Sequence, residues 1–297
     1  MWLAFALLSP ALYAISEICD NFLVNKRFKH PLILIFFTSL FNLFYAPVLF
    51  YFKHPVIPPL STLPIFILLG FVNVAYLYPY YKGLQSDDTS VAISFLAIER
   101  LMVPILAFLI VGEVLNFSQY LGILIIVISV VLLGLRHANS KFKLSKGVWY
   151  ISLAGLFLAF EGVFLKLLFD QGVSVSTAIG GEAIFSLFFS FSLLILPKIR
   201  RDVRTMFPAF MVLAPLFLIE ELFTFLGLLA EGYAISLASV SVVKGITMAA
   251  PFYLLIYAWL GGGIFPSLFK ENLHRKNVVK KLLLFVVLIV GILLIKE

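Results

Sequence analysis

Long, nearly uninterrupted apolar runs follow one another along the whole chain, and they constrain its fold more than any other feature. A helix that crosses the hydrocarbon core of a bilayer needs about 20 such residues. Of the 297 residues, 62% are hydrophobic and 12% charged, against roughly 45–50% and about 25% in soluble domains. The runs do not alternate as barrel strands do. Because spanning helices satisfy their own backbone hydrogen bonds, the sequence predicts an all-α integral membrane protein.

The apolar runs predict ten transmembrane helices joined by short polar or Pro/Gly loops. The first run has no basic segment before it, so we expect a retained helix rather than a cleaved signal. The last long connection, GGGIFPSLFKENLHRKN, is expected to form a flexible turn and then an interfacial basic segment. The predicted spans are 2–24, 31–52, 63–84, 88–111, 117–136, 147–168, 175–196, 207–230, 235–259 and 278–296.

An internal repeat relates the two parts of the chain. SLFNLFYAPVLF (39–50) aligns with AIFSLFFSFSLL (183–194). Two halves of five helices are therefore expected, at 1–140 and 145–297. Because five is odd, the second half must enter the membrane inverted, an arrangement typical of secondary transporters. Similar offsets align three further pairs in the same order: Glu17 with Glu161, Gly83 with Gly232, and Pro104 with Pro251.

Lysine and arginine gather in the first, fifth, seventh and ninth predicted loops, whereas the even loops hold little beyond Lys53. The positive-inside rule then places the odd loops in the cytoplasm and both termini outside, most simply in the cell membrane. The net charge of +7 comes from these loops. It favours contact with the headgroups of anionic membrane lipids and not with nucleic acid.

The stretch YYKGLQSDDTSVAISFLAIERLMVPILAFLIVGEVLNFSQYLGILIIVISVVLLGL (80–135) resembles the EamA-type members of the drug/metabolite transporter superfamily. The shared pattern is a proline, about eight apolar residues, Gly-Glu and a short turn into a glycine-containing helix, here Pro104, Gly112, Glu113 and Gly122. The resemblance implies ten helices in two inverted EamA-like repeats around a central cavity. The second half keeps Pro251 but has Trp-Leu where Gly-Glu would fall. Family members usually have cytoplasmic termini; we follow the loop charges, which indicate the reverse.

A second resemblance lies at the start of the chain. EICDNFLVNK (17–26) is similar to the first helix of the four-helix small multidrug resistance proteins, in which one glutamate binds proton and cationic substrate competitively. The resemblance implies that role for Glu17 and, through the repeat, for Glu161. In the sugar-phosphate and nucleotide-sugar branches a lysine of the ninth helix meets the substrate's phosphate, which implies the same role for Lys244.

Several ionisable residues fall deep inside predicted spans, where each costs roughly 2.5–3.5 kcal/mol. Tyr13, Glu17, Asp20 and Asn21 share one helix face. They form either a polar stripe that lines a cavity, with Glu17 and Asp20 binding substrate or protons, or a structural contact between helices. Glu161 either shares this role or forms an ion pair with Lys166 or Lys244.

Glu99 and Arg100 are neighbours whose side chains point about 100° apart on a helix, so they are not expected to pair with each other. The candidate partners are Lys244 for Glu99, and Glu220 or Glu221 for Arg100. Structural pairing and direct substrate contact both remain open for these residues.

Four tyrosines lie on both faces of the third span. Some of Tyr76, Tyr78, Tyr80 and Tyr81 must line the interior, with Tyr78 as the predicted binding residue, whereas interfacial anchoring is favoured for Tyr80 and Tyr81 near the helix end. Gly83 and Gly232 are expected to allow tight turns. A structural or gating role is predicted for Pro104, Gly112, Glu113 and Pro251, together with Gly83 and Gly232.

The sequence favours transport over catalysis. It has no G-x-x-x-x-G-K-[ST] loop for ATP, and its four histidines lack metal or triad spacing, so we expect no enzyme activity, cofactor or metal. Because the deep acids outnumber the deep bases, the expected substrate is a cationic or zwitterionic small molecule such as an amine or amino acid, with protons as a candidate coupling ion. The alternatives are a carrier of phosphorylated or nucleotide-sugar anions and a lipid-carrier flippase, in either case a monomer or homodimer.

Overall fold

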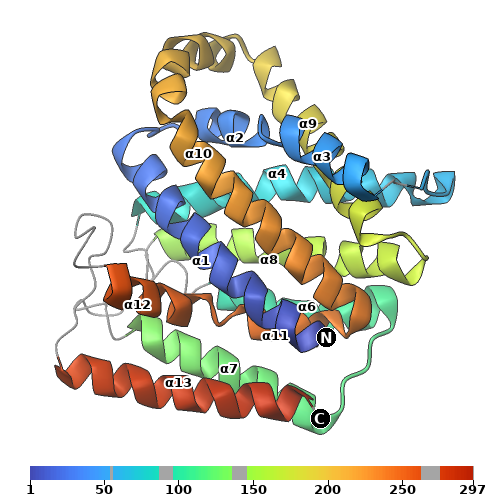
Figure 1. Ribbon diagram of the computed structural model, residues 1–297, viewed down its shortest axis with the longest axis vertical. Coiled ribbons are helices and arrows are strands. Elements are labelled where there is room, and N and C mark those ends of the chain that lie inside the picture. Colours follow the sequence, from blue (N-terminus) through green and yellow to red (C-terminus); the bar gives the residue numbers. More distant parts are fainter. Residues whose placement is uncertain (54–55, 87–95, 136–145, 262–274, 297) are drawn as a thin grey trace.

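The computed structural model describes residues 1–53, 56–86, 96–135, 146–261 and 275–296, and every regular element in these ranges is helical. Figure 1 shows long helices stacked across the view, with both ends of the chain toward the lower right. The helices are α1 (Trp2–Lys26), α2 (Pro31–Ser39), α3 (Asn42–Lys53), α4 (Leu63–Ser86), α6 (Ala97–Val111), α7 (Phe117–Leu135), α8 (Lys146–Asp170), α9 (Val175–Ser192), α10 (Pro197–Leu237), α11 (Val240–Thr247), α12 (Ala250–Gly261) and α13 (Arg275–Lys296).

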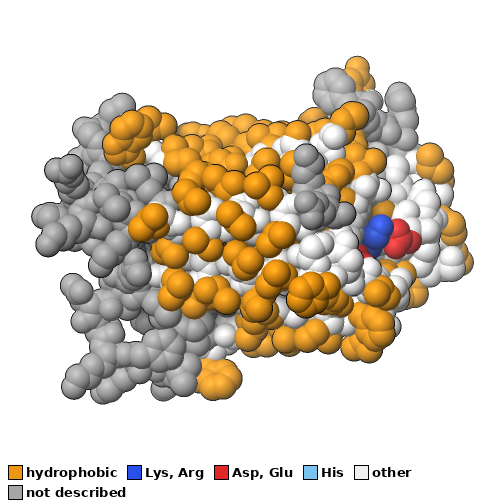
Figure 2. All heavy atoms as spheres, turned by 90° about the horizontal axis from the view of Figure 1, so that it is seen from below, with side chains coloured by type: hydrophobic (Ala, Val, Ile, Leu, Met, Phe, Trp, Pro, Cys, Tyr) orange, Lys and Arg blue, Asp and Glu red, His pale blue; other side chains and the backbone are white. Residues whose placement is uncertain are grey.

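Within the described residues, six helical segments are long and apolar enough to cross a membrane. They are Trp2–Asn25, Pro31–Tyr51, Leu60–Ser86, Trp149–Asp170, Val175–Ile195 and Pro197–Leu237. The face in Figure 2 is covered by hydrophobic side chains, as expected of a surface in contact with lipid. The prediction of an all-helical, multi-pass membrane protein is confirmed, and the count of ten spans stays a prediction.

Two predicted spans are broken near their middle. The predicted span 31–52 is divided into α2 and α3 by a turn at Leu40 and Phe41, and the predicted span 235–259 into α11 and α12 by a turn at Met248 and Ala249. Pro251 lies in the first turn of α12, where a missing backbone N–H leaves no helical hydrogen bond unmade. Apolar periodicity does not reveal such breaks, and backbone hydrogen bonds of the turns, such as Phe41 N–H to Thr38 O and Ala249 N–H to Ile246 O, carry the chain through them.

The prediction of a loop at 197–206 is wrong, because these residues begin the 41-residue helix α10. Pro197 occupies the first turn of α10, a position that favours helix initiation. At 1.5 Å per residue α10 is about 60 Å long, twice the roughly 30 Å of a bilayer core. Its first turns lie at an angle to the long diagonal part in Figure 1, and Pro208 and Pro215 inside the helix account for the bend.

The first and second parts of the chain are interleaved rather than side by side. Helix α1 packs along α10, α4 along α8, α3 against α9, and α7 against α13. Stacked phenylalanines join α2 to α10, with the rings of Phe37 and Phe210 4.4 Å apart. At the α7–α13 crossing, a Cβ on Gly122 would lie 2.7 Å from the carbonyl oxygen of Gly291. Only glycine permits this approach of the two backbones.

Gly83 and Gly232 are not turn residues, which corrects the prediction. Gly83 lies inside α4 and Gly232 inside α10. A Cβ on Gly83 would lie 2.2 Å from Ile151 Cγ1, and one on Gly232 would lie 3.1 Å from both Val175 and Ile179. Each glycine therefore allows a neighbouring helix to pack closely.

Some predictions fall partly or wholly outside the described residues. They concern the start of the span at 88–111, most of the connection 137–146, and most of the stretch 261–277 with its expected flexible turn.

Candidate substrate-binding site

A cavity of about 180 Å³ lies among α1, α2, α3, α4, α6, α8, α9, α10 and α11. Its lining is acidic, with eight carboxylic acids against two basic side chains, Arg100 and Lys244. Tyrosine, serine, threonine and asparagine side chains supply most of the remaining polar groups. The eight acids are Glu17, Asp20, Glu99, Glu161, Glu182, Glu220, Glu221 and Glu231.

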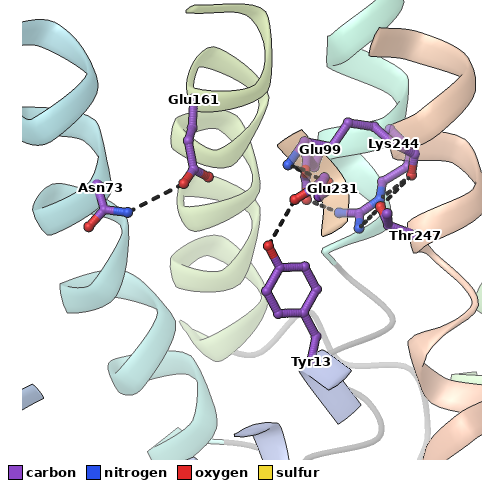
Figure 3. Close-up of polar contacts among 8 residues, drawn as sticks. Tyr13, Asn73, Glu99, Glu161, Glu231, Lys244 and Thr247 are labelled. Atoms are coloured by element: carbon purple, nitrogen blue, oxygen red, sulfur yellow. Dashed lines mark hydrogen bonds and ion pairs between the residues drawn. The ribbon is translucent and has the colours of Figure 1, made fainter. Parts of the chain in front are cut away.

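Both bases belong to a balanced group of four, Glu99, Arg100, Glu231 and Lys244, which we call the ion-pair network. Lys244 Nζ lies 3.2 Å from Glu99 Oε1 and 3.0 Å from Glu231 Oε1. Arg100 contacts Glu99. Figure 3 shows the network, with the Tyr13 hydroxyl directed at Glu231 and donating to its Oε2 over 2.9 Å. Two acids thus face two bases inside the network.

Arg100 also fixes the end of α11. Its Nε donates to the Lys244 carbonyl oxygen over 3.0 Å, and its Nη2 donates to Thr247 Oγ1 over 3.2 Å. The carbonyls in the last turn of a helix have no intrahelical donor, so a guanidinium there is well placed. The Lys244 side chain in turn lies over Gly162, where a Cβ would be 2.6 Å from Lys244 Cε.

The predicted pair of Glu99 with Lys244 is confirmed. The expectation that Glu99 and Arg100 do not pair is wrong, as is a pairing of Arg100 with Glu220 or Glu221. The 100° between neighbours describes how side chains leave a helix, whereas the long arginine side chain can turn back to a neighbouring carboxylate. Lys244 draws Glu99 to the end of α11, where Arg100 also binds.

Glu231 was missed because the sequence places it between two predicted spans. The structure places it inside α10, 2% exposed and bound to both Lys244 and Tyr13. A signal was present: Glu220, Thr224 and Glu231 are spaced by four and seven residues, which puts them on one helix face. Reading 207–237 as one helix would have revealed that face.

A second group, the α1/α10 acid cluster, comprises Glu17, Asp20, Glu220 and Glu221. Asp20 interacts electrostatically with the other three. The hydroxyls of Tyr80 and Tyr81 each donate to Asp20 over 3.3 Å. Glu220 Oε1 accepts from Ser16 at 3.1 Å and Thr224 at 3.2 Å. Glu17 Oε2 and Glu220 Oε2 are buried and have no hydrogen-bond partner among the described residues.

A third group, the α8/α9 acid pair, comprises Glu161 and Glu182. Asn73 of α4 bridges the two, its Nδ2 lying 3.3 Å from Glu161 Oε1 and 2.7 Å from Glu182 Oε1. Ser186 Oγ donates to Asn73 Oδ1 over 3.1 Å and so fixes the amide orientation. Glu182 is 1% exposed, and its Oε2 has no hydrogen-bond partner within the described ranges.

The alternative pairing of Glu161 with Lys166 is not formed. Lys166 Nζ instead lies 2.8 Å from Asp170, one turn farther along α8. Lys244 is close enough to Glu161 and Glu182 to interact electrostatically, but its direct contacts are with Glu99 and Glu231.

The tyrosines of α4 are arranged differently from the prediction. Tyr78 is 38% exposed and absent from the cavity lining, so its predicted place in the interior is wrong. Tyr76, Tyr80 and Tyr81 line the cavity, and the last two bind Asp20 instead of anchoring the helix at the interface. Span length alone placed Tyr80 and Tyr81 near the surface, whereas α4 continues to Ser86 and keeps them buried.

Glu113 connects the end of α6 to the start of α11. Gly112 ends α6 in the left-handed conformation with φ 71°, which turns the chain toward α11. Glu113 then accepts from Ser239 Oγ at 2.7 Å and from the backbone N–H groups of Val240 and Ser241 at 2.9 and 3.2 Å. A carboxylate at a helix N-terminus is stabilised by these free N–H groups. Pro104 lies within α6.

A comparison with known protein families finds a similarity in the first half of the chain. A model of the EamA-like transporter family matches residues 1–135. Residues 1–135 are therefore similar to the EamA-like transporters. The EamA-type resemblance is thereby confirmed, and the family points to transport of a small substrate across a membrane rather than to an enzyme.

Structural similarity extends the comparison beyond the EamA-like half. A crystal structure described only as "Crystal structure of protein" superposes with a TM-score of 0.65 over 99% of this chain and 98% of its own, at 15% identity. In all, 28 chains of solved structures match. At this identity the similarity concerns the fold alone. Among curated proteins, none matches the sequence.

The cavity lining presents groups suited to binding a small molecule. Among the described residues, no group of three or more histidine, cysteine or acidic side chains could hold a metal ion. The lining instead presents carboxylates with unused oxygens, beside tyrosine and hydroxyl side chains. Such groups accept hydrogen bonds from a cation and exclude an anion.

Proposed function

We propose that the protein is a secondary transporter that moves a small cationic or zwitterionic metabolite through this cavity. The charge imbalance of the lining carries the proposal: eight acids face two bases, and both bases are paired within the ion-pair network. Six carboxyl groups remain without a basic partner in the described part of the cavity. Buried charge of one sign is costly, so protons or a cationic substrate must neutralise it.

Alternating access between two inverted five-helix halves, 1–140 and 145–297, is part of the proposal. Under this division the first helix of each half packs on the third helix of the other, as α1 does on α10 and α8 on α4. The second helices also pack together, α3 on α9, and the fifth helices likewise, α7 on α13. This reciprocal packing is what a pseudo-twofold axis in the membrane plane produces. The ten spans and the cytoplasmic odd loops belong to the same proposal.

Glu17 is the proposed proton site, with Glu161 as its counterpart in the second half. Glu17 Oε2 is buried and has no hydrogen-bond partner in the described ranges, while Glu161 accepts from Asn73. An unpartnered carboxyl oxygen beside Asp20 favours uptake of a proton whenever no cation is bound.

Transport of phosphorylated anions is the weaker alternative. Lys244 would have to bind the phosphate, but its ammonium group already contacts Glu99 and Glu231. A phosphate would also lie among unpaired carboxylates. The cavity of about 180 Å³ is smaller than the roughly 300–1,000 Å³ of sites for drug-sized ligands, which favours a small substrate over a nucleotide sugar or lipid carrier.

The test is thermal melting of the purified protein against amines, amino acids, phosphorylated sugars, nucleotides and lipids. A ligand at 100 times its Kd stabilises the folded state by about 2.7 kcal/mol. We expect stabilisation by an amine or amino acid that is lost in Glu17→Gln and kept in Asp170→Asn, a control outside the cavity. Stabilisation only by phosphorylated compounds, lost in Lys244→Ala, would support the anion carrier instead. Stabilisation only by lipids would support a flippase.

A further inference from the structure

The lining divides its unpaired acids between two places, and this division specifies the substrate more closely. We infer that the substrate carries two separated cationic groups, as a short linear diamine does. The α1/α10 acid cluster binds one ammonium group, and the α8/α9 acid pair binds the other. The inference rests on the proposed transport of a cationic or zwitterionic substrate.

Helix α4 contacts both acidic groups, so the spacing of its contact residues gives the distance between the groups. Asn73 binds the α8/α9 acid pair, whereas Tyr80 and Tyr81 bind Asp20 of the α1/α10 acid cluster. These contact points are seven to eight residues apart, or about 10–12 Å along the helix. Tyr76 lies between them on α4 and interacts electrostatically with both groups, through Glu161 on one side and Asp20 on the other. The two groups are thus separate sites joined by one tyrosine.

Each acidic group offers an unused acceptor to an incoming ammonium. Glu220 Oε2 in the α1/α10 acid cluster and Glu182 Oε2 in the α8/α9 acid pair are buried and lack a hydrogen-bond partner among the described residues. Both side chains line the cavity and are at most 3% exposed. A buried acceptor without a partner costs about 1–3 kcal/mol, more when it is charged. An ammonium group has three N–H donors and can supply the missing hydrogen bond to Glu220 Oε2 or to Glu182 Oε2.

Among the described residues that line the cavity, the ion-pair network leaves no free base for a substrate carboxylate. Arg100 and Lys244 are engaged by Glu99 and Glu231. An amino acid would have to displace one of these carboxylates or place its own among the unpaired acids. A dication meets neither obstacle, so the two-site lining favours a diamine over a zwitterion.

The spacing limits the substrate's length. A charge-assisted N–H···O bond of about 2.8 Å at each end of a span of about 10–12 Å leaves roughly 4–6 Å between the two nitrogens. An extended chain of three or four carbons fits this distance, and a five-carbon chain fits it when bent, with its methylene groups against the Tyr76 ring.

Titration calorimetry of the full-length protein in uncharged detergent tests the inference. The probes are pentylamine, 1,5-diaminopentane, 1,10-diaminodecane and lysine. We expect 1,5-diaminopentane to bind at least about tenfold more tightly than pentylamine, which corresponds to a difference in binding free energy of roughly 1.4 kcal/mol. The ten-carbon diamine and lysine should bind less tightly than the five-carbon diamine. This comparison needs no variant and therefore does not depend on how a substitution folds.

Variants at the two sites give the second measurement. Glu182→Gln and Glu220→Gln should each reduce diamine affinity toward that of pentylamine, and Asp170→Asn should leave it unchanged. Pentylamine needs only one site, so only one of the two substitutions should weaken it substantially. Equal binding of pentylamine and 1,5-diaminopentane would overturn the two-site inference and leave the proposed transport of a cation standing. Binding of phosphorylated compounds with no binding of any amine or amino acid would overturn both.

Discussion

Glu17 is the residue at which proton coupling is most directly tested. Its free carboxyl oxygen, buried beside Asp20, is the proposed proton acceptor. Glutamine keeps the shape of the side chain and cannot titrate. We expect Glu17→Gln to abolish amine uptake driven by a proton gradient, measured in proteoliposomes with and without an imposed pH difference. Uptake by Glu17→Gln that still follows the gradient would remove Glu17 from the mechanism, and Asp170→Asn is the matched control.

Gly162 determines where the Lys244 side chain lies. A methyl group at this position would lie 2.6 Å from Lys244 Cε, so Gly162→Ala must shift this flexible side chain and disturb its contacts with Glu99 and Glu231. Breaking a buried pair typically costs about 3–5 kcal/mol. We expect a lower melting temperature and weaker amine binding.

Gly245→Ala is the control for this substitution. Its new methyl group would meet only the ends of Ile123 and Ile295 side chains, at 3.3 and 3.4 Å. If Gly162→Ala and Gly245→Ala melt at the same temperature, the position of Lys244 contributes little to stability.

At the scale of the helices, α7 and α13 form a pair whose backbones nearly touch. A Cβ on Gly291 would lie 2.7 Å from Ile126 Cγ1 and 3.0 Å from the carbonyl oxygen of Gly122. Overpacking of this kind costs about 1–3 kcal/mol. We therefore expect Gly291→Ala to lower the melting temperature without changing which amines bind. Leu124→Ala, on the lipid-facing side of α7, should have a smaller effect. Changed ligand selectivity would show that this pair also shapes the cavity.

The helices also show what apolar periodicity can and cannot predict. Spans such as α1, α4, α7 and α8 were placed within a few residues, because a bilayer demands a continuous apolar run. Apolar periodicity does not predict the turns within two spans, because apolar residues continue through those turns. It also does not predict the length of α10, because basic residues interrupt the apolar run at the start of that helix. Glu17, Asp20 and Glu161 stood out as charges within such runs. Glu231 did not stand out, because it falls in the short segment between the predicted spans 207–230 and 235–259.

Across the whole molecule, Glu113 is a contact between the two proposed halves. It belongs to the first half and binds the start of α11 in the second. Losing three hydrogen bonds there should favour separation of the halves at that end. We expect Glu113→Ala to speed labelling of a cysteine placed at Leu228, in a Cys19→Ser background, by a membrane-impermeant maleimide. Ser118→Ala, on an exposed neighbour, is the control. Equal labelling rates in the two variants would limit Glu113 to a static role.

The six unpaired carboxyl groups have a consequence for the empty carrier. Without cargo, their mutual repulsion in a site of low dielectric opposes closure around the cavity. The return of the transporter to its other conformation therefore requires bound protons or another bound cationic molecule. Efflux of amine trapped inside vesicles should therefore speed up when amine or acid is added outside, and efflux that neither addition changes would show that the vacant cavity closes freely.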